Sequence, residues 1–314
     1  MGENGTVKLY LGAEEKYVGD YASTEDYELH SISYSCNADG VAVAAYNDQA
    51  TLHSLSPSLT TETFVVLEHA ARDPAVEVLI WTATGERAFS SGAALRGDKT
   101  VHVPKHALED YAKRGMLSRP GDMVMAAQTI AFWDFPKPLI AAVNGLAVGG
   151  GANIALANYA DMVLCSSNAR FKYPFAELGL TPELGSSLVI PFLVGMSKAK
   201  EIMMIGEWFS AEDAVRLGLA NEVVEPDQLM ARATEIATDL TTKQADALRL
   251  AKRVMNRACP APWPNPRSAS RLRLLPISLG ADHLRKDLEE VLAVELETIM
   301  EAVGATGGFD NAKL

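Results

Sequence analysis

The stretch PLIAAVNGLAVGGGANIALA, residues 138–157, constrains the fold more than any other part of the chain. An apolar run leads into glycines at 145, 149, 150 and 151, and helix-forming residues follow. The glycines and two asparagines interrupt the apolar character too often for a membrane-spanning helix, so the stretch predicts a buried strand, a turn and a helix. The glycines do not follow the spacing G-x-G-x-x-G, which excludes a dinucleotide-binding fingerprint.

The glycine cluster has two physical explanations, and both stay open at this point. A glycine-rich entry to a helix exposes unpaired backbone N–H groups, which bind anions or a developing oxyanion. Alternatively, the glycines let the helix lie close against the preceding strand, because they carry no side chain.

Further apolar runs alternate with helical segments along the chain. Strands are predicted from continuous or alternating apolar runs at 29–35, 40–48, 76–83, 138–145, 161–165 and 219–224. Helices are predicted from their spacing and capping residues at 57–72, 210–218, 228–240, 242–258 and 281–303. This alternation indicates an α/β fold.

The domain organisation is predicted from changes in composition along the chain. Residues 1–28 are polar and are expected to form an irregular N-terminal arm, and residues 29–226 form the α/β core. Residues 227–303 are expected to form a helical C-terminal segment, interrupted by a proline-rich linker. The glycine-rich residues 304–314 are expected to be a flexible tail.

Charge and cysteine content exclude several classes of protein. The net charge is −12, which disfavours non-specific binding to nucleic acid or to an anionic membrane. The three cysteines are widely spaced and predict neither a disulfide framework nor a zinc site. His102 and His106 have a metal-like spacing, but Pro104 lies between them, so no metal site is expected. The N-terminus lacks the pattern of a secretory signal.

Two other loops carry candidate functional residues. The segment AFSSGAAL, residues 88–95, follows a buried strand and has a glycine before small residues, as a ligand-facing loop or a plain turn would. The segment FAELGLTPELGSS contains Glu177 and Glu183. Thr181 and Pro182 predict a helix start there, so Glu183 is either an acidic residue of the first turn or a base in a pocket. Glu177 is expected to face solvent.

Four segments, in this order and spacing, resemble the crotonase, or enoyl-CoA hydratase/isomerase, superfamily: AFSSGAAL, PLIAAVNGLAVGGG, ARFKYPFAELGLTPELGSS and SAEDAVRLGLANEVVEPDQL. The resemblance covers roughly residues 29–258. It implies a spiral of ββα turns in place of a doubly wound sheet, with a C-terminal helical segment that forms homotrimers or hexamers. It also implies an acyl-CoA thioester as substrate and no separate cofactor.

The resemblance assigns roles to the first two loops. By position, Ala93 and Gly150 are expected to donate backbone N–H groups to the thioester oxygen, with Gly92 and Gly149 beside them at the substrate. Loss of one such donor typically lowers the rate about 10²- to 10³-fold.

The departures from the family pattern predict the type of reaction. Hydratases in the family use two glutamates, whose positions are occupied here by Asn153 and Phe175. Glu183 stands where peroxisomal-type Δ3,Δ2-enoyl-CoA isomerases carry their acid, so this chain is expected to be such an isomerase, with Glu183 as the proton carrier. Asn153, Phe175 and Leu180 are expected to contact the substrate.

Positive charge for the CoA phosphates is expected from Arg96 and from a helix that carries Lys252 among other basic residues, although such a face can equally be solvated. The chain ends in Ala312-Lys313-Leu314, a relative of the Ser-Lys-Leu peroxisomal address, which predicts an import receptor as a partner and a peroxisomal location. If the tripeptide is accidental, a cytoplasmic location is expected. The alternatives to the isomerase are a dienoyl-CoA isomerase, a hydratase, a thioester hydrolase or a non-catalytic binding protein.

Overall fold

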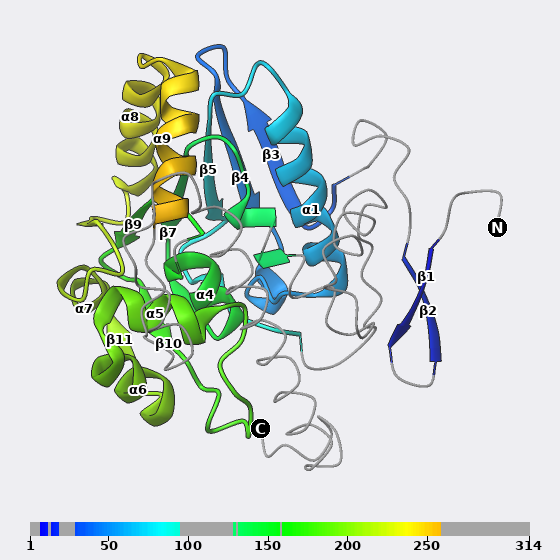
Figure 1. Cartoon of the computed structure of the whole chain (residues 1–314), viewed down its shortest axis with the longest axis vertical. Coiled ribbons are helices and arrows are strands. Elements are labelled where there is room, and N and C mark those ends of the chain that lie inside the picture. Colours follow the sequence, from blue (N-terminus) through cyan, green and yellow to red (C-terminus); the bar gives the residue numbers. More distant parts are fainter. Residues whose placement is uncertain are drawn as a thin grey trace, which may run out of the picture.

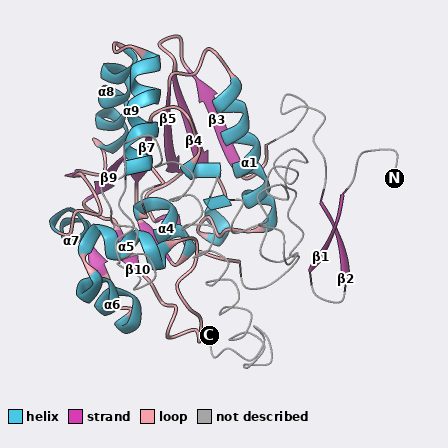
Figure 2. Cartoon of the chain, viewed as in Figure 1, coloured by secondary structure: helices cyan, strands magenta, loops and turns pink. Residues whose placement is uncertain are grey.

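The computed structural model describes residues 29–94, 128–129, 131–157 and 159–258, together with the backbone of two N-terminal strands (Figure 1). Two sheets form the centre of the structure, and helices surround them (Figure 2). This arrangement confirms the predicted α/β class and the spiral of strand pairs that the family resemblance implies.

The larger sheet has six strands in the order β12-β9-β7-β5-β4-β3. The strands are β3 (Ile32–Cys36), β4 (Val41–Tyr46), β5 (Val78–Ala83), β7 (Leu139–Val143), β9 (Met162–Ser166) and β12 (Glu222–Val224). β3 and β4 form an antiparallel hairpin around Asp39-Gly40, a dipeptide typical of hairpin turns, and the other neighbours are parallel. Every residue of β5 and β7 is buried, as their continuous apolar runs predict.

The smaller sheet has the order β11-β10-β8-β6. Its strands are β6 (Ala88–Ser90), β8 (Leu146–Val148), β10 (Arg170–Lys172) and β11 (Phe209–Ser210). In the consecutive pairs β5/β6, β7/β8 and β9/β10, the first strand joins the larger sheet and the second joins the smaller one. Each turn of the chain therefore adds one strand to the larger sheet and one strand to the smaller sheet, so successive turns lie side by side.

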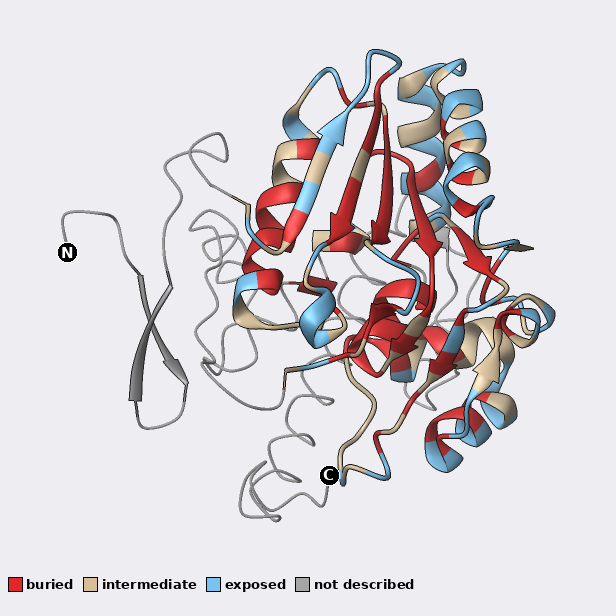
Figure 3. Cartoon of the chain, turned by 180° about the vertical axis from the view of Figure 1, so that it is seen from behind, coloured by how far each residue is buried: buried red, intermediate tan, exposed pale blue. Residues whose placement is uncertain are grey.

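The described α-helices are α1 (Pro57–Arg72), α4 (Gly150–Leu156), α5 (Ser186–Val194), α6 (Met196–Ile205), α7 (Ala211–Arg216), α8 (Leu229–Thr241) and α9 (Ala245–Ala258), and a 3-10 helix, η2, spans Gln49–Thr51. Alternation along β5 directs its side chains to two cores. Val78 and Ile80 pack with α8, whereas Leu79 and Trp81 face the core that includes α1. The strands β4, β5, β7 and β9 are largely buried between these layers, while most of the edge strand β3 and the outer helix faces are exposed (Figure 3).

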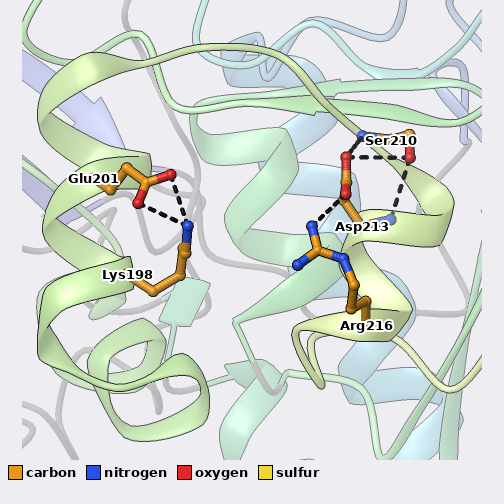
Figure 4. A network of polar contacts seen from close by, with 5 residues as sticks. All are labelled: Lys198, Glu201, Ser210, Asp213 and Arg216. Carbon is orange, nitrogen blue, oxygen red and sulfur yellow. Dashed lines mark hydrogen bonds and ion pairs between the residues drawn. The ribbon is translucent and has the colours of Figure 1, made fainter.

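The start of α7 confirms the predicted capping box (Figure 4). The Ser210 hydroxyl accepts a hydrogen bond from the Asp213 amide, and the Asp213 carboxylate accepts one from the Ser210 amide, both at 3.2 Å. Arg216, one turn later, forms an ion pair with Asp213. These contacts define where the helix begins after β11.

The first 28 residues contain more regular structure than the expected irregular arm. β1 (Val7–Leu11) and β2 (Glu14–Val18) pair as an antiparallel hairpin. The segment 7–11, VKLYL, is rich in β-branched, aromatic and other apolar residues, which favours a strand despite the polar composition of its surroundings. The proline-rich linker, the predicted helix at 281–303 and the tail at 304–314 lie outside the described residues.

Two kinds of feature are absent from the part of the chain that the structure describes. No helix there is long and apolar enough to cross a membrane. No group of three or more His, Cys, Asp or Glu side chains there is arranged to hold a metal ion. His102 and His106 lie outside these residues.

A buried carboxylate joins α1 to the beginning of β3. Glu62 is fully buried, and its two oxygens accept backbone hydrogen bonds from His30 at 3.0 Å and from Ser31 and Ile32 at 2.7 Å each. The Ser58 hydroxyl donates a further bond at 3.3 Å. The backbone N–H groups that precede the edge strand are thus satisfied by a helix side chain.

We expect Glu62→Gln to lower the free energy of unfolding by about 2 kcal/mol, because an amide cannot accept at both ends and hydrogen bonds to a charged group are strong. Denaturant titration measures the change. Glu207→Gln, at an exposed glutamate, is the matched control and should leave the midpoint unchanged. Equal stability of the two variants would contradict the role of Glu62.

Candidate active site

Three loops meet at one edge of the smaller sheet. They follow β6, β8 and β10, which are parallel neighbours, so their carboxyl ends lie together. The first two loops are in close contact at Gly92. A Cβ atom on Gly92 would lie 2.5 Å from the Val148 carbonyl oxygen and 3.7 Å from the Gly150 amide nitrogen.

The amide of Ala93 is left open by the way in which its loop is held. Leu55 donates its N–H to the Gly92 carbonyl at 2.8 Å, and its carbonyl accepts from Ala94 at 3.4 Å. Leu55 thus forms hydrogen bonds with the residues before and after Ala93, as in a parallel β-bridge. In this pairing the N–H of Ala93 itself faces away from Leu55. Among the described residues this N–H has no hydrogen-bond partner, and Ala93 is exposed.

The second loop brings the start of α4 to the same place. Gly149 has a positive φ of 52° and donates its N–H to the Lys172 carbonyl at 2.9 Å, which ties this loop to the end of β10. Gly150 is the first residue of α4, so its N–H has no acceptor within the helix. Gly151 lies against β6, where a Cβ atom would be 2.6 Å from the Ser90 carbonyl oxygen. The packing explanation therefore holds for Gly151, while Gly150 presents an N–H without an acceptor in the helix, as the anion-binding explanation requires.

The third loop places a carboxylate beside Gly150. A Cβ atom on Gly150 would lie 3.2 Å from Glu183 Oε1, 2.9 Å from Leu55 Cδ1 and 3.4 Å from Leu184 Cδ1. Glu183 is half-buried. A carboxylate with apolar neighbours and an adjacent backbone N–H is suited to move a proton while a charge develops on a nearby oxygen.

The predicted helix start at Thr181 and Pro182 was wrong, so Glu183 is not an acidic residue of a first helical turn. α5 begins only at Ser186, and Thr181, Pro182 and Glu183 are irregular. Leu184 and Gly185 have positive φ angles of 54° and 70°, and two consecutive left-handed residues cannot belong to a right-handed helix. Glu183 is therefore held by its loop and not by a helix.

The residues at the two hydratase positions lie close to this loop. Asn153 is fully buried, and its Nδ2 donates to the main-chain oxygen of Glu183 at 2.9 Å. Phe175 is buried and stacks on Tyr173 with ring centroids 5.9 Å apart. Its carbonyl accepts from the Leu180 amide at 2.8 Å, and Leu180 packs against the core. Contact of these three residues with a substrate stays a prediction.

The other charged residues that the sequence singles out are Glu177, Lys252 and Arg96, and the surroundings of the first two differ from those of Glu183. Glu177 is exposed, as expected, and forms an ion pair with Lys172 at 2.9 Å. Lys252 requires a correction, because it is buried and not on a phosphate-binding face. Its Nζ donates to Asp161 Oδ2 at 2.8 Å and to the Lys137 carbonyl at 3.0 Å, and burial lowers its pKa. The helical pattern shows a basic residue but not which way it points. Arg96 lies outside the described residues.

His53, which no sequence motif singles out, supports the first loop. The main-chain carbonyl of His53 accepts from Ser90 Oγ at 2.7 Å. Its Nδ1 accepts from the Asp48 amide at 3.0 Å, so the neutral ring donates from Nε2 to the Thr84 carbonyl at 3.0 Å. Burial lowers the pKa of His53. The left-handed φ of 56° at His53 is the feature of the structure that draws attention to this residue. No pattern in the sequence indicates its role.

Comparisons with known proteins identify the family of this chain. The model of the enoyl-CoA hydratase/isomerase family matches residues 37–274. A short-chain-enoyl-CoA hydratase of Clostridium acetobutylicum is 36% identical over 217 residues, which are 69% of this chain and 78% of that protein. A crotonyl-CoA hydratase of Syntrophomonas wolfei subsp. wolfei is 32% identical over 216 residues, with the same shares covered. The crystal structure of an enoyl-CoA hydratase from Mycobacterium marinum has a TM-score of 0.59 and 33% identity, and the match covers 72% of this chain and 99% of that one.

Alanine substitutions at Gly150 and Gly151 should distinguish the glycine that packs against a strand from the glycine that binds a ligand. We expect Gly151→Ala to lower the free energy of unfolding by about 1–3 kcal/mol, because the methyl group meets the Ser90 backbone. Gly150→Ala should change stability by less than about 1 kcal/mol, since its methyl group meets mainly the ends of side chains. The same methyl group should weaken acyl-CoA binding by at least about tenfold, or 1.4 kcal/mol, as measured by calorimetry. Unchanged affinity in Gly150→Ala would contradict the assignment of the site.

The lowered pKa of His53 predicts a loss of stability in acid. The unfolded chain takes up this proton with a pKa of about 6.5, whereas the folded protein takes it up only at lower pH. The contribution is therefore complete above pH 6.5 or so and is lost as the pH falls toward the folded pKa. His53→Asn, which tolerates the left-handed backbone, should show a shallower decline of unfolding free energy between about pH 7 and 5, by at most about 1.4 kcal/mol per pH unit. Identical slopes for both proteins in denaturant titrations would exclude His53 as the cause.

Proposed function

The chain belongs to the enoyl-CoA hydratase/isomerase family, and from this premise we propose that it moves a double bond of an enoyl-CoA from position 3 to position 2. The observation that carries the proposal is the carboxylate of Glu183 beside Gly150. A base next to an oxyanion-binding amide is the minimum that such a reaction needs.

The two open amides have the first role in this mechanism. The N–H groups of Ala93 and Gly150 bind the thioester oxygen and stabilise the negative charge that forms on it. This charge stabilisation makes the hydrogen on C2 acidic enough for a carboxylate to remove.

Glu183 then carries one proton between two carbons. It takes the proton from C2, and the electrons of the broken C2–H bond delocalise as a dienolate onto the thioester oxygen. The resulting carboxylic acid gives the same proton to C4, so the double bond is left between C2 and C3 and the carboxylate is restored. The reaction consumes no water and uses no cofactor beyond the CoA portion of the substrate.

Hydration is the second candidate, because the two relatives described above are named as hydratases. In this chain the positions of the two hydratase glutamates carry Asn153, whose Nδ2 is bonded to the Glu183 carbonyl, and the buried apolar Phe175. Neither side chain can take a proton from water at neutral pH. These residues favour isomerisation, with Glu183 as its agent.

We expect Glu183→Gln to lower kcat for the conversion of 3-enoyl-CoA to 2-enoyl-CoA by about 10³-fold, because the amide cannot accept the C2 proton. The matched control is Glu177→Gln, in the same segment, which should retain wild-type activity. Product mass distinguishes isomerisation from addition of water. Full activity of Glu183→Gln would exclude the proposed base, and a hydrated product as the main one would exclude the proposed reaction.

The proposal also covers the oligomeric state of the protein and its location in the cell. We propose a homotrimer or a hexamer, as the family resemblance implies, and import into peroxisomes through Ala312-Lys313-Leu314. The tripeptide lies outside the described residues. Light scattering tests the assembly, and a cytoplasmic distribution of the full chain in cells would argue against the import signal.

A further inference from the structure

The main-chain oxygen of Glu183 accepts hydrogen bonds from two different residues. It accepts from Asn153 Nδ2 at 2.9 Å, from Ser186 Oγ at 2.6 Å and from the Ser186 amide at 3.1 Å. The next carbonyl, that of Leu184, accepts from the Tyr159 hydroxyl. Asn153 and Ser186 are fully buried, so water does not replace these donors.

The loop needs such support because its backbone is unfavourable. Leu184 has a left-handed φ of 54°, which a branched side chain adopts only where the surroundings impose it. The accepting groups are the carbonyl of Glu183, just before this residue, and the carbonyl of Leu184 itself. The backbone that carries the acid is therefore determined by buried side chains from elsewhere in the fold.

Asn153 is the donor that links the acid to the oxyanion site. It lies three residues after Gly150, on the same face of α4. Its Oδ1 has no hydrogen-bond partner among the described residues, so within that part of the chain the bond to Glu183 is what orients its amide. One short helix thus presents the Gly150 amide and anchors the backbone of Glu183.

We propose that Asn153 is a positioning residue, whose side-chain amide holds the Glu183 carbonyl and so aims the carboxylate at the space beside Gly150. This inference rests on the proposed function and deepens it. Asn153 would then act on the reaction by positioning Glu183, and not by the expected direct contact with the substrate.

The identity of residue 153 then decides between two chemistries. A glutamate there, as the family's hydratases carry, has no N–H to donate, and its carboxylate would face the Glu183 carbonyl oxygen. A water-activating acid at position 153 and a Glu183 loop anchored as in this structure therefore exclude each other. Asn153 therefore has two effects: it replaces an acid that hydration needs, and it supports Glu183, the proposed base of the isomerase.

The test compares Asn153→Asp and Asn153→Leu with the wild type in a 3-enoyl-CoA isomerisation assay across pH. Asn153→Leu should lose about 10- to 100-fold in kcat at every pH, with KM changed less than about threefold, because a misplaced base acts on a substrate that still binds. In Asn153→Asp, the introduced carboxyl group can donate to the Glu183 carbonyl when it is protonated and cannot donate when it is ionised. The ratio of kcat in Asn153→Asp to that of the wild type should therefore fall as the pH rises.

The matched control is Asn168→Asp, at an exposed asparagine, whose pH profile should follow the wild type. A kcat of Asn153→Leu within about twofold of the wild type, or a pH-independent ratio for Asn153→Asp, would overturn the proposal. If circular dichroism shows that the Asn153 variants do not fold, Ser186→Ala serves instead, because it removes a second donor from the same oxygen. Its kcat should fall with KM unchanged, and an unchanged kcat would overturn the proposal.

Hydrogen–deuterium exchange separates this inference from the proposed function. The Ser186 amide should exchange faster in Asn153→Leu than in the wild type, whichever reaction the protein catalyses. An inactive wild type with faster exchange in the variant would refute the isomerase and support the anchor. Unchanged exchange at Ser186 would refute the anchor even if the wild type is an active isomerase.

Discussion

The parallel pairing of β6, β8 and β10 is the constraint on which the rest of the site depends. Because neighbouring parallel strands end at one edge of a sheet, three loops far apart in the sequence meet there. The spiral of strand pairs produces this pairing, since each turn adds a strand to the smaller sheet next to the one before it. The site is therefore a consequence of the topology, and the loops supply only its chemical groups.

Close backbone approach is the second requirement, and glycine makes it possible. Gly92 lies against the Val148 carbonyl and near the Gly150 amide, and Gly151 lies against Ser90. With side chains at these positions, the two open amides could not share one ligand atom. The same absence of side chains leaves room for the Glu183 carboxylate next to Gly150.

Buried polar groups complete the site by holding its irregular segments. His53 is fixed by Asp48 and Thr84 through its ring nitrogens and holds Ser90, before the loop of Ala93, through its carbonyl. Asn153 and Ser186 hold the carbonyl of Glu183. Loops of this kind have no repeating backbone pattern to stabilise them. Their conformation depends on donors and acceptors from elements distant in the sequence.

The sequence by itself determined the strands and helices whose patterns are local, such as β5, β7 and the capped α7, as well as the family and the choice of Glu183 as the candidate acid. These follow from apolar runs, from capping residues and from motif spacing, which need no knowledge of distant contacts. Only the tertiary structure decided that Lys252 points inward to Asp161, that Glu183 precedes α5 and that Asn153 reaches the Glu183 carbonyl. Each of these depends on which groups the folded chain brings together, because a side chain's direction and a left-handed backbone are set by long-range contacts and not by neighbours in sequence.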